Sequence, residues 1–272
     1  MISIAPSYQQ LTSIPESFGA DLRIMHLEKV RGYLPDLDEL RALCVPGTKL
    51  VCVNNPNNPT GALMSGDMLL EIADIARSAG AWVLCDEVYR CLNQADGPSE
   101  SMADIYEKGI SVGSMSKVFS LAGLRLGWIA AKDSELRASL LSHRDYNLIS
   151  CGLFDEALAA LALRHADVLL SRSRGIVREN LAILDAWVAG EPRISYVKPQ
   201  SGTTALIYYD YDLESYAFCQ RMFAETGAFV TPGDCFGEEK CWRIGYGCDR
   251  DTLTEGLSAV SAFLRTLEKE GL

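Results

Sequence analysis

Apolar and polar positions along the first two-thirds of the chain follow two alternating patterns. The run LVCVNN at residues 50–55 is continuously apolar up to its asparagines, which predicts a buried strand that ends in a turn-rich stretch. Residues 65–79 then carry apolar side chains at helical spacing, with Ser65 as a helix N-cap and Gly80 at the end. The run AWVLCDEV at 81–88 predicts the next strand, so the order is strand, helix, strand.

Two further runs extend this alternation. GISVGS at 109–114 and LGWIAA at 126–131 each have the length and composition of a short strand. Strands that alternate with helices predict an α/β fold whose sheet is mostly parallel, with helices on both faces. In such sheets ligands bind at the carboxyl ends of the strands. Polar residues that follow a strand are therefore the first candidates for chemistry.

The pattern changes near residue 134, where long helical segments with little turn chemistry begin. The remainder, 193–272, is predicted as strand, strand, helix, strand, strand and helix, which is an α+β unit. About 80 residues is the size of a small domain. We therefore predict a large domain over 1–165, and over 166–272 a linking long helix followed by a smaller C-terminal α+β domain.

Composition and charge narrow the classes of partner. The chain has 272 residues, of which 48% are hydrophobic and 22% charged, as in ordinary globular proteins. The formal net charge of −11 argues against a nucleic-acid partner, which requires clustered Lys and Arg. Apolar runs are too short to span a membrane, and the opening residues do not resemble a secretion signal. We predict a cytoplasmic protein without a membrane or nucleic-acid partner.

Cysteine usage makes a metal site or a disulfide framework improbable. The nine cysteines are odd in number and include no Cys-x-x-Cys pair. Cys52 and Cys85 lie in apolar runs, where a free thiol behaves as a small hydrophobic group. Cys235, Cys241 and Cys248 lack the spacing of a zinc site. We expect no metal and reduced thiols.

Two short segments follow predicted strands and carry groups suited to chemistry. Asn58 lies in the run NPTG, which by itself reads as a turn. Asp86 ends the strand AWVLC, where a carboxylate is costly to bury unless it meets a cation or hydrogen-bond donors. A protonated pyridine nitrogen would satisfy it, and Tyr89 could reach the phenolic oxygen of the same ring. A helix N-cap at Asp86 is the alternative.

A lysine and an arginine follow next. Lys117 lies in a turn of small residues after the strand 109–114, between Ser114 and Ser116 on one side and Ser120 on the other. A lysine amine is a nucleophile towards carbonyls once its pKa is lowered, and serine hydroxyls suit phosphate oxygens. Arg125 could bind a phosphate through two parallel hydrogen bonds. A surface lysine and a structural salt bridge are the respective alternatives.

Taken together, these segments resemble a known family. The run NNPTG, then DEVYR, then SMSKVFSLAGLRLGW matches the class I/II aminotransferases of the pyridoxal-5′-phosphate (PLP) fold-type I enzymes in order, spacing and strand context. The resemblance implies the fold-type I architecture and a homodimer. CWRIGYG at 241–247 looks like the family segment whose arginine binds the substrate α-carboxylate. The resemblance covers almost all of residues 1–268.

The resemblance also implies a role for each candidate residue. Lys117 would form the Schiff base with PLP and shuttle the proton, while Asp86 would pair with the pyridine nitrogen. Asn58 and Tyr89 would hydrogen-bond the ring O3′, which holds down the pKa of the internal aldimine. The phosphate would be bound by Ser114, Ser116 and Arg125. Arg243 would bind the substrate carboxylate.

The front end departs from the family pattern. Family members usually carry an earlier N-terminal β-α unit, which supplies a Gly-rich phosphate-binding turn and an aromatic residue that stacks on the pyridine ring. Here the opening ISIAPSYQQL resembles the segment just after that stacking position. A shortened product of an ordinary aminotransferase and a compact variant are both compatible with this pattern. Either would expose apolar surface and an open sheet edge.

Three functions are therefore open. The first is transfer of an amino group between an amino acid and a 2-oxo acid. The second is another fold-type I reaction on an amino acid, as in a decarboxylase, a C–S lyase or a cyclising enzyme of natural-product biosynthesis, because fold does not fix the reaction. The third is a truncated, non-catalytic remnant. The first two functions differ in their products, because transamination alone yields a 2-oxo acid together with pyridoxamine 5′-phosphate. The presence of the lysine, aspartate and arginine argues against the third.

Overall fold

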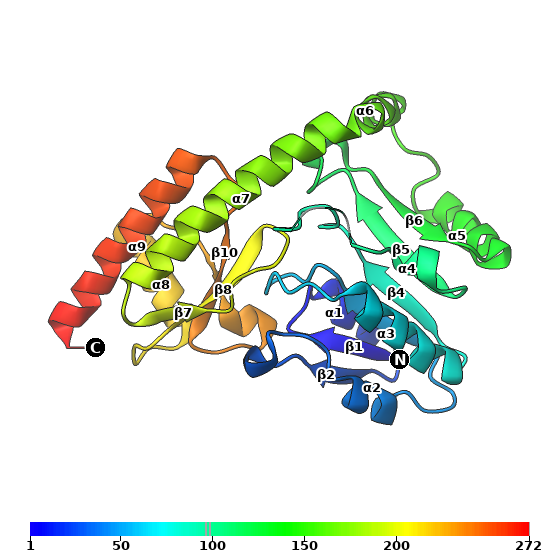
Figure 1. Cartoon of the computed structure of the whole chain (residues 1–272), viewed down its shortest axis with the longest axis horizontal. Coiled ribbons are helices and arrows are strands. Elements are labelled where there is room, and N and C mark those ends of the chain that lie inside the picture. Colours follow the sequence, from blue (N-terminus) through cyan, green and yellow to red (C-terminus); the bar gives the residue numbers. More distant parts are fainter. Residues whose placement is uncertain (96, 98, 272) are drawn as a thin grey trace.

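The computed structural model describes residues 1–95, 97 and 99–271 (Figure 1). Its first sheet consists of β1 (Ile2–Ala5), β2 (Arg23–His26), β3 (Leu50–Asn54), β4 (Trp82–Asp86), β5 (Gly109–Ser114) and β6 (Gly127–Ala131). The strands lie in the order β2-β1-β3-β4-β5-β6, and β6 alone runs antiparallel to its neighbour. The predicted α/β fold with a mostly parallel sheet is confirmed.

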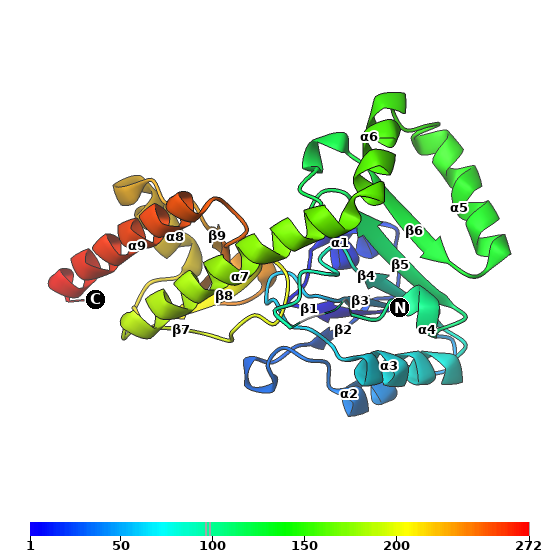
Figure 2. The same ribbon diagram turned by 45° about the horizontal axis from the view of Figure 1, so that its top comes forward.

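Helices cover both faces of this sheet. α1 (Gln10–Ser17) lies on one face, and α2 (Leu37–Leu43), α3 (Gly66–Ser78) and the single turn α4 (Met102–Ile105) lie on the other (Figure 2). This division follows from the strand order, because right-handed crossovers that step in opposite directions from the centre place their helices on opposite faces. The Ser65 hydroxyl caps α3 by accepting from the Met68 amide at 3.2 Å, as expected.

The C-terminal part is built on a second, antiparallel sheet. Along the chain, this sheet comes after three helices, α5 (Ser134–Asn147), α6 (Leu153–Arg164) and the long α7 (Ala166–Gly190). The sheet has the order β7-β8-β10-β9, with β7 (Ile194–Tyr196), β8 (Thr204–Tyr209), β9 (Thr231–Pro232) and β10 (Cys241–Gly245), and it packs with α8 (Ser215–Thr226) and α9 (Arg250–Glu270). The predicted boundary at residue 165 falls between α6 and α7, and the division into domains stays a prediction.

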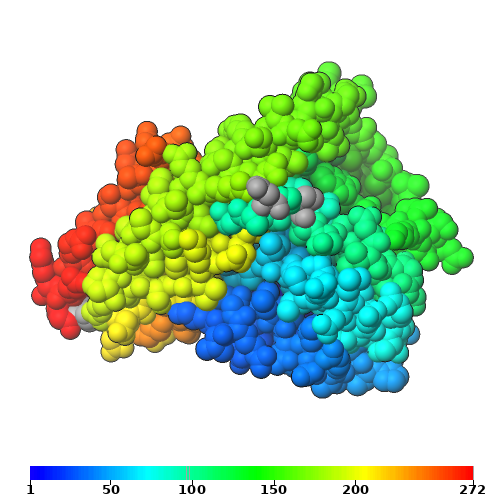
Figure 3. All heavy atoms as spheres, in the orientation of Figure 1, coloured from blue at the N-terminus to red at the C-terminus, as the bar shows by residue number. Residues whose placement is uncertain are grey.

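Two hydrophobic cores hold these parts. In the first, the buried faces of β1, β3 and β4 pack against Leu69 and Ile72 of α3. The second is centred on Phe218, whose ring stacks on Tyr209 and Trp242 with centroid distances of 4.0 and 5.2 Å. The segment around β8 lies directly against the N-terminal residues in Figure 3, where the Tyr33 and Tyr208 hydroxyls are hydrogen-bonded at 2.5 Å.

The nine cysteines are all free, and Cys52 and Cys85 are buried in the first sheet as predicted. Among the described residues, no group of three or more His, Cys, Asp or Glu side chains could hold a metal ion. Within the same ranges, each helix is too short or too polar to cross a bilayer.

The region from β6 to the start of α7 carries many exposed apolar side chains. β6 ends the first sheet, and the residues of β6 are exposed or half-buried. The two helices that follow it add further exposed apolar side chains. The exposed large hydrophobic residues of this region are Trp128, Ile129, Leu141, Tyr146, Leu148, Ile149, Leu153, Phe154, Leu158, Leu161, Leu163 and Val168. Exposed apolar side chains gathered on successive elements are typical of an interaction surface.

Candidate active site

The carboxyl ends of four neighbouring parallel strands meet at one cavity. β1, β3, β4 and β5 end on the same edge of the first sheet, and the loop that precedes β8 together with β10 closes the opposite side. The cavity has a volume of about 480 Å³, within the usual range of small-molecule sites. Its lining residues are Tyr8, Asn54, Asn58, Asp86, Val88, Tyr89, Ser114, Ser116, Lys117, Ala122, Arg125, Thr203, Thr204 and Arg243.

Asn54 joins two of the strand ends. It lies directly opposite Asp86 in the β3–β4 pairing and is fully buried. Its side-chain nitrogen donates to the Asp86 carbonyl at 2.9 Å, and its side-chain oxygen accepts from the Asn58 amide at 2.7 Å. This one amide therefore fixes the loop that carries Asn58 relative to the end of β4.

Asp86 occupies the floor of the site. One carboxylate oxygen accepts from the Val88 amide at 3.1 Å, but this bond closes a turn and no described helix begins at Asp86, so the helix N-cap alternative is wrong. Burial raises the pKa of the Asp86 carboxyl above its ordinary value, and the nearby Lys117 amine opposes that rise. A cation brought close to Asp86 would favour its ionised form.

Tyr89 stands beside the lysine. Its side chain is buried, and the Lys117 Nζ lies 6.0 Å from the centre of its ring. Burial raises the pKa of the Tyr89 hydroxyl, while a hydrogen bond with Thr203 and the charge of Arg243 oppose the rise. The phenol is therefore held as a neutral hydrogen-bond donor at ordinary pH.

The turn after β5 presents hydroxyls and two cations. The Ser114 hydroxyl donates to the Leu126 carbonyl at 3.3 Å and accepts from the Ser116 amide at 3.0 Å, which holds the turn closed. Lys117 and Arg125 are exposed, and both line the cavity. Arg125 has a φ of +52°, in the left-handed region, and its Nη1 donates to the Ala122 carbonyl at 2.8 Å. Cations and hydroxyls gathered on one wall suit a phosphate group.

The Arg243 side chain reaches from the second sheet to the loop that follows β3 of the first sheet. It lies on β10, where its guanidinium donates to the Asn58 side-chain oxygen and to the Thr231 hydroxyl, each at 3.2 Å. These two bonds leave further N–H groups of the guanidinium for a ligand. Because Asn58 accepts from Arg243 through its oxygen, its amide nitrogen is left as the donor.

Gly61 allows the Asn58 loop to approach the second part of the chain. Its φ is +71°, and a Cβ added there would lie 2.5 Å from the Pro199 Cβ and 2.9 Å from the Thr204 carbonyl oxygen. No side chain fits such a position. The glycine of the NPTG run therefore brings Asn58 against the loop that carries Thr203 and Thr204.

The structure thus brings together all eight residues singled out from the sequence: Asn58, Asp86, Tyr89, Ser114, Ser116, Lys117, Arg125 and Arg243. It also shows residues that the sequence analysis missed. Tyr8, three residues after the end of β1, lines the same cavity, although it was not among the candidate site residues. Asn54 was missed as well. Both lie at the carboxyl end of a parallel strand, which is the signal that identified Asp86.

Comparison with known proteins identifies the family. The family model described as "Aminotransferase class I and II" matches residues 1–260. The chain therefore belongs to the class I and II aminotransferase family. A crystal structure of a PLP-dependent aminotransferase from Streptococcus suis is similar at 42% identity and a TM-score of 0.94. That match covers 98% of this chain and 70% of the other. The predicted resemblance and the fold-type I architecture are confirmed.

Among curated relatives, capreomycidine synthase from Streptomyces vinaceus is 33% identical over 98% of this chain and 68% of its own length. Nicotianamine aminotransferase A from Hordeum vulgare is 26% identical over 92% of this chain and 58% of its own length. A solved PLP-dependent cyclase, OrfR, is 29% identical with a TM-score of 0.88, covering 97% of this chain and 71% of that one. The chain therefore spans between 58% and 71% of these relatives' length.

The residues present suit the cofactor of this family, which is PLP. PLP carries a phosphate, a phenolic oxygen, an aldehyde and a basic ring nitrogen. The cavity offers hydroxyls and Arg125 for the first, and the donors Asn58 and Tyr89 for the second. Lys117 could supply the amine for the aldehyde. Asp86, a buried carboxyl with a raised pKa, could accept from a protonated ring nitrogen.

Proposed function

We propose that the protein is a cytoplasmic PLP-dependent aminotransferase that moves an amino group between an amino acid and a 2-oxo acid. One observation carries the proposal: Lys117, Asp86 and Arg125 converge on a single cavity with the cross-sheet Arg243. A lysine, a carboxylate and a phosphate-binding cation are the complementary groups that the cofactor requires. The same convergence speaks against a non-catalytic remnant.

Each residue then has a physical task. Ser114, Ser116 and Arg125 would hold the phosphate, and Asn58 and Tyr89 would donate to the phenolic oxygen. Tyr8 would contribute an aromatic wall. When bound, PLP withdraws electrons from the substrate α-carbon. Asp86 would keep the ring nitrogen protonated, which sustains that withdrawal. The Lys117 amine would hold the cofactor at rest and then carry the proton that leaves and returns at the α-carbon.

A half-reaction tests this function. The PLP-loaded protein is incubated with a panel of single amino donors, without an acceptor, and the products are quantified by mass spectrometry. Transamination requires the 2-oxo acid and pyridoxamine 5′-phosphate to appear together in equal amounts. Consumption of a donor that yields neither product would sink the proposal.

Cyclisation of an amino acid is a second candidate. It is supported by the similarity to capreomycidine synthase and to the cyclase OrfR. Both reactions would use Lys117 and the electron withdrawal that PLP supplies, and they would differ in the product that leaves the site. In the panel above, a product of altered mass that retains its amino nitrogen, with the cofactor recovered as PLP, would identify this activity.

The substitution Arg243→Lys tests the proposed carboxylate site. Lysine keeps the positive charge but lacks the planar pair of N–H donors. The hydrogen bonds that the Arg243 guanidinium donates to Asn58 and Thr231 are lost with it. We expect the KM for the amino donor to rise about 10- to 100-fold, with kcat changed only a few-fold. Arg221→Lys is the control, because Arg221 pairs with Glu225 and Glu270 away from the cavity. An unchanged KM would remove Arg243 from substrate binding.

We also propose a homodimer that buries the apolar face of β6, α5 and α6. Phe154 on this face is 82% exposed, and Phe229 near β9 is equally exposed. Sedimentation of the wild type should give about twice the 29.8 kDa chain mass. Phe154→Asp should shift the protein towards the monomer because it charges the apolar face, whereas Phe229→Asp should not. A monomeric wild type, or equal effects of the two variants, would contradict the proposal.

A further inference from the structure

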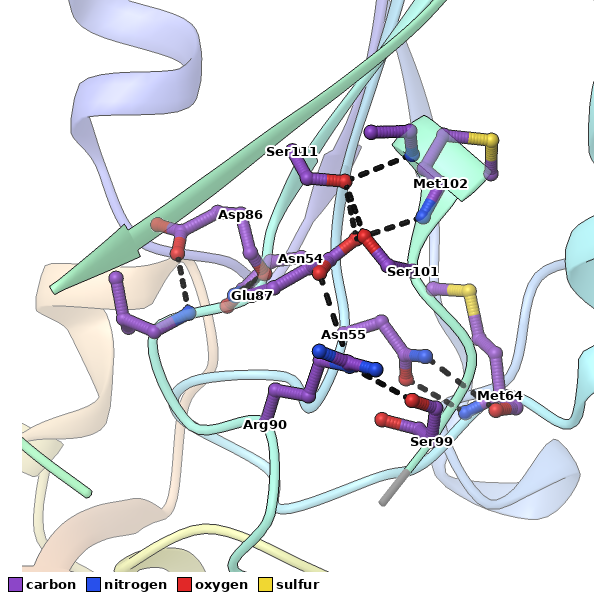
Figure 4. A network of polar contacts seen from close by, with 12 residues as sticks. Asn54, Asn55, Met64, Asp86, Glu87, Arg90, Ser99, Ser101, Met102 and Ser111 are labelled. Carbon is purple, nitrogen blue, oxygen red and sulfur yellow. Dashed lines mark hydrogen bonds and ion pairs between the residues drawn. The ribbon is translucent and has the colours of Figure 1, made fainter. Parts of the chain in front are cut away.

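Glu87 is a buried carboxylate that none of the roles above uses. It follows Asp86 directly and precedes Tyr89 by two residues, yet it does not line the cavity. Only 7% of its surface is exposed. Figure 4 shows the two neighbouring carboxylates pointing in different directions, with Asp86 towards the Val88 amide and Glu87 towards Ser101 and Ser111.

Neutral donors satisfy this carboxylate. Its Oε1 accepts from the Ser111 hydroxyl at 2.6 Å, the Met102 amide at 2.8 Å and the Ser101 hydroxyl at 3.2 Å. Among the described residues, its one ion-pair partner is Arg90, whose Nε lies 4.0 Å from Oε2 and donates to the Ser99 carbonyl at 2.7 Å. A buried carboxylate without a close cation depends on its hydrogen bonds, and losing them leaves a costly charge.

These donors come from separate segments. Ser111 lies in β5, whereas Ser101 and Met102 lie at the start of α4. The Ser111 hydroxyl also contacts Ser101 at 2.8 Å and accepts from the Ala103 amide at 2.9 Å, so the hydroxyls and the carboxylate form one network. Within the backbone, the Glu87 amide donates to the Val112 carbonyl at 2.8 Å. Glu87 is therefore fixed at both its main chain and its side chain.

We infer that Glu87 is a positioning residue for the cofactor site. Held between β5 and α4, it fixes the segment that presents Asp86 on one side and Tyr89 on the other. The inference rests on the proposed function, since these two residues are assigned to the cofactor ring there. Groups that contact a reacting centre must be held by locked neighbours, because small displacements weaken their action strongly.

Three variants and a control test this inference. Glu87→Ala removes the acceptor, whereas Glu87→Gln keeps an oxygen that can accept from Ser111 and Met102. Ser111→Ala removes one donor and is the milder change. Glu191→Ala is the matched control: Glu191 is also 7% exposed, accepts from the Ser261 hydroxyl, has Arg265 Nη2 at 3.5 Å, and does not line the cavity.

The measurements are PLP affinity, the pH midpoint of the visible band of the lysine-bound cofactor, and the melting temperature of the cofactor-free protein. Glu87→Ala should weaken PLP binding about 10- to 100-fold. It should also raise the pH midpoint by about one unit, because a displaced Tyr89 no longer stabilises the phenolic oxygen. Ser111→Ala should shift both in the same direction by less. Glu87→Gln should restore both, and Glu191→Ala should lower only the melting temperature.

The outcomes separate the two claims. A wild type that forms no visible band with PLP would sink the proposed function. The Glu87 inference alone would be overturned by a different result. In that case the wild type forms the band, and Glu87→Ala lowers the melting temperature as Glu191→Ala does but keeps the wild-type PLP affinity and pH midpoint. If Glu87→Ala does not fold, Ser111→Ala decides, and an unshifted midpoint in that variant overturns the inference equally.

Discussion

Replacing Lys117 with alanine is expected to lower the rate of amino transfer by about 10⁴-fold or more. The lysine has two tasks in the proposed function, holding the cofactor and carrying the proton, and no second lysine lines the cavity among the residues that the structure describes. Loss of both tasks in one step should exceed the loss from any other single substitution at the site. The rate is measured as a single turnover of the PLP-loaded protein with an amino donor.

A chemical readout accompanies the rate. Borohydride reduction of the PLP-loaded wild type should attach the cofactor irreversibly to the peptide that contains Lys117, as measured by mass spectrometry after digestion. Lys198→Ala is the control, because Lys198 is exposed and pairs with Asp185 outside the cavity. Labelling at another lysine, or an unchanged rate in Lys117→Ala, would contradict the assignment. Lys117→Ala should still fold, because Lys117 is exposed.

The sequence predicts this site well because its parts obey a local rule. Asp86 and Ser114 each stand at the end of an apolar run, and the carboxyl ends of parallel strands meet at one edge. The strand–helix–strand order was readable from periodicity and from caps such as Ser65. These two facts account for the candidates that follow β3, β4 and β5, whereas Arg243 was assigned by the family resemblance and reaches the site from the second sheet.

Tyr8, Asn54 and Thr203 show where this reasoning ends. The rule applies to Tyr8 only once β1 is known to lie beside β3, and strand order is set by long-range packing that periodicity does not reveal. Asn54 appears in the sequence as part of an asparagine-rich turn, while its buried amide joins two loops. Thr203 reaches Tyr89 from the loop that precedes β8, through a contact between segments more than a hundred residues apart.

β6 shows a different gap. Its sequence LGWIAA predicts a strand, but its direction is antiparallel to β5 and its outer edge has no partner among the described strands. Trp128 lies over Gly113, where an added Cβ would be 2.3 Å from the indole ring. Such an edge invites association with a further chain or segment. The exposed apolar surface and open sheet edge that the departure at the front end predicts are found here, and the proposed homodimer would cover them.

Replacing Asp86 with asparagine is expected to have opposite effects on catalysis and on the stability of the cofactor-free fold. Asparagine keeps the shape and can still accept from the Val88 amide, but it cannot ionise. The ring nitrogen would lose its partner anion, and amino transfer should fall about 10³-fold. The measurement is a single turnover with the same amino donor. Asp86→Glu, which keeps the charge in a displaced position, should retain part of the rate.

The stability effect follows from the pKa of Asp86. Burial raises it in the folded protein, so the carboxyl contributes most to stability when protonated, and that contribution is lost as the pH rises through the folded pKa. At neutral pH the cofactor-free Asp86→Asn variant should therefore melt a few degrees above the wild type. The difference should vanish below about pH 4, where the wild-type carboxyl is protonated in both states. Saturating PLP should reverse the order at neutral pH, because the bound cation stabilises only the ionised aspartate. If the wild type and the Asp86→Asn variant melt at equal temperatures both with and without PLP, Asp86 does not contact the cofactor.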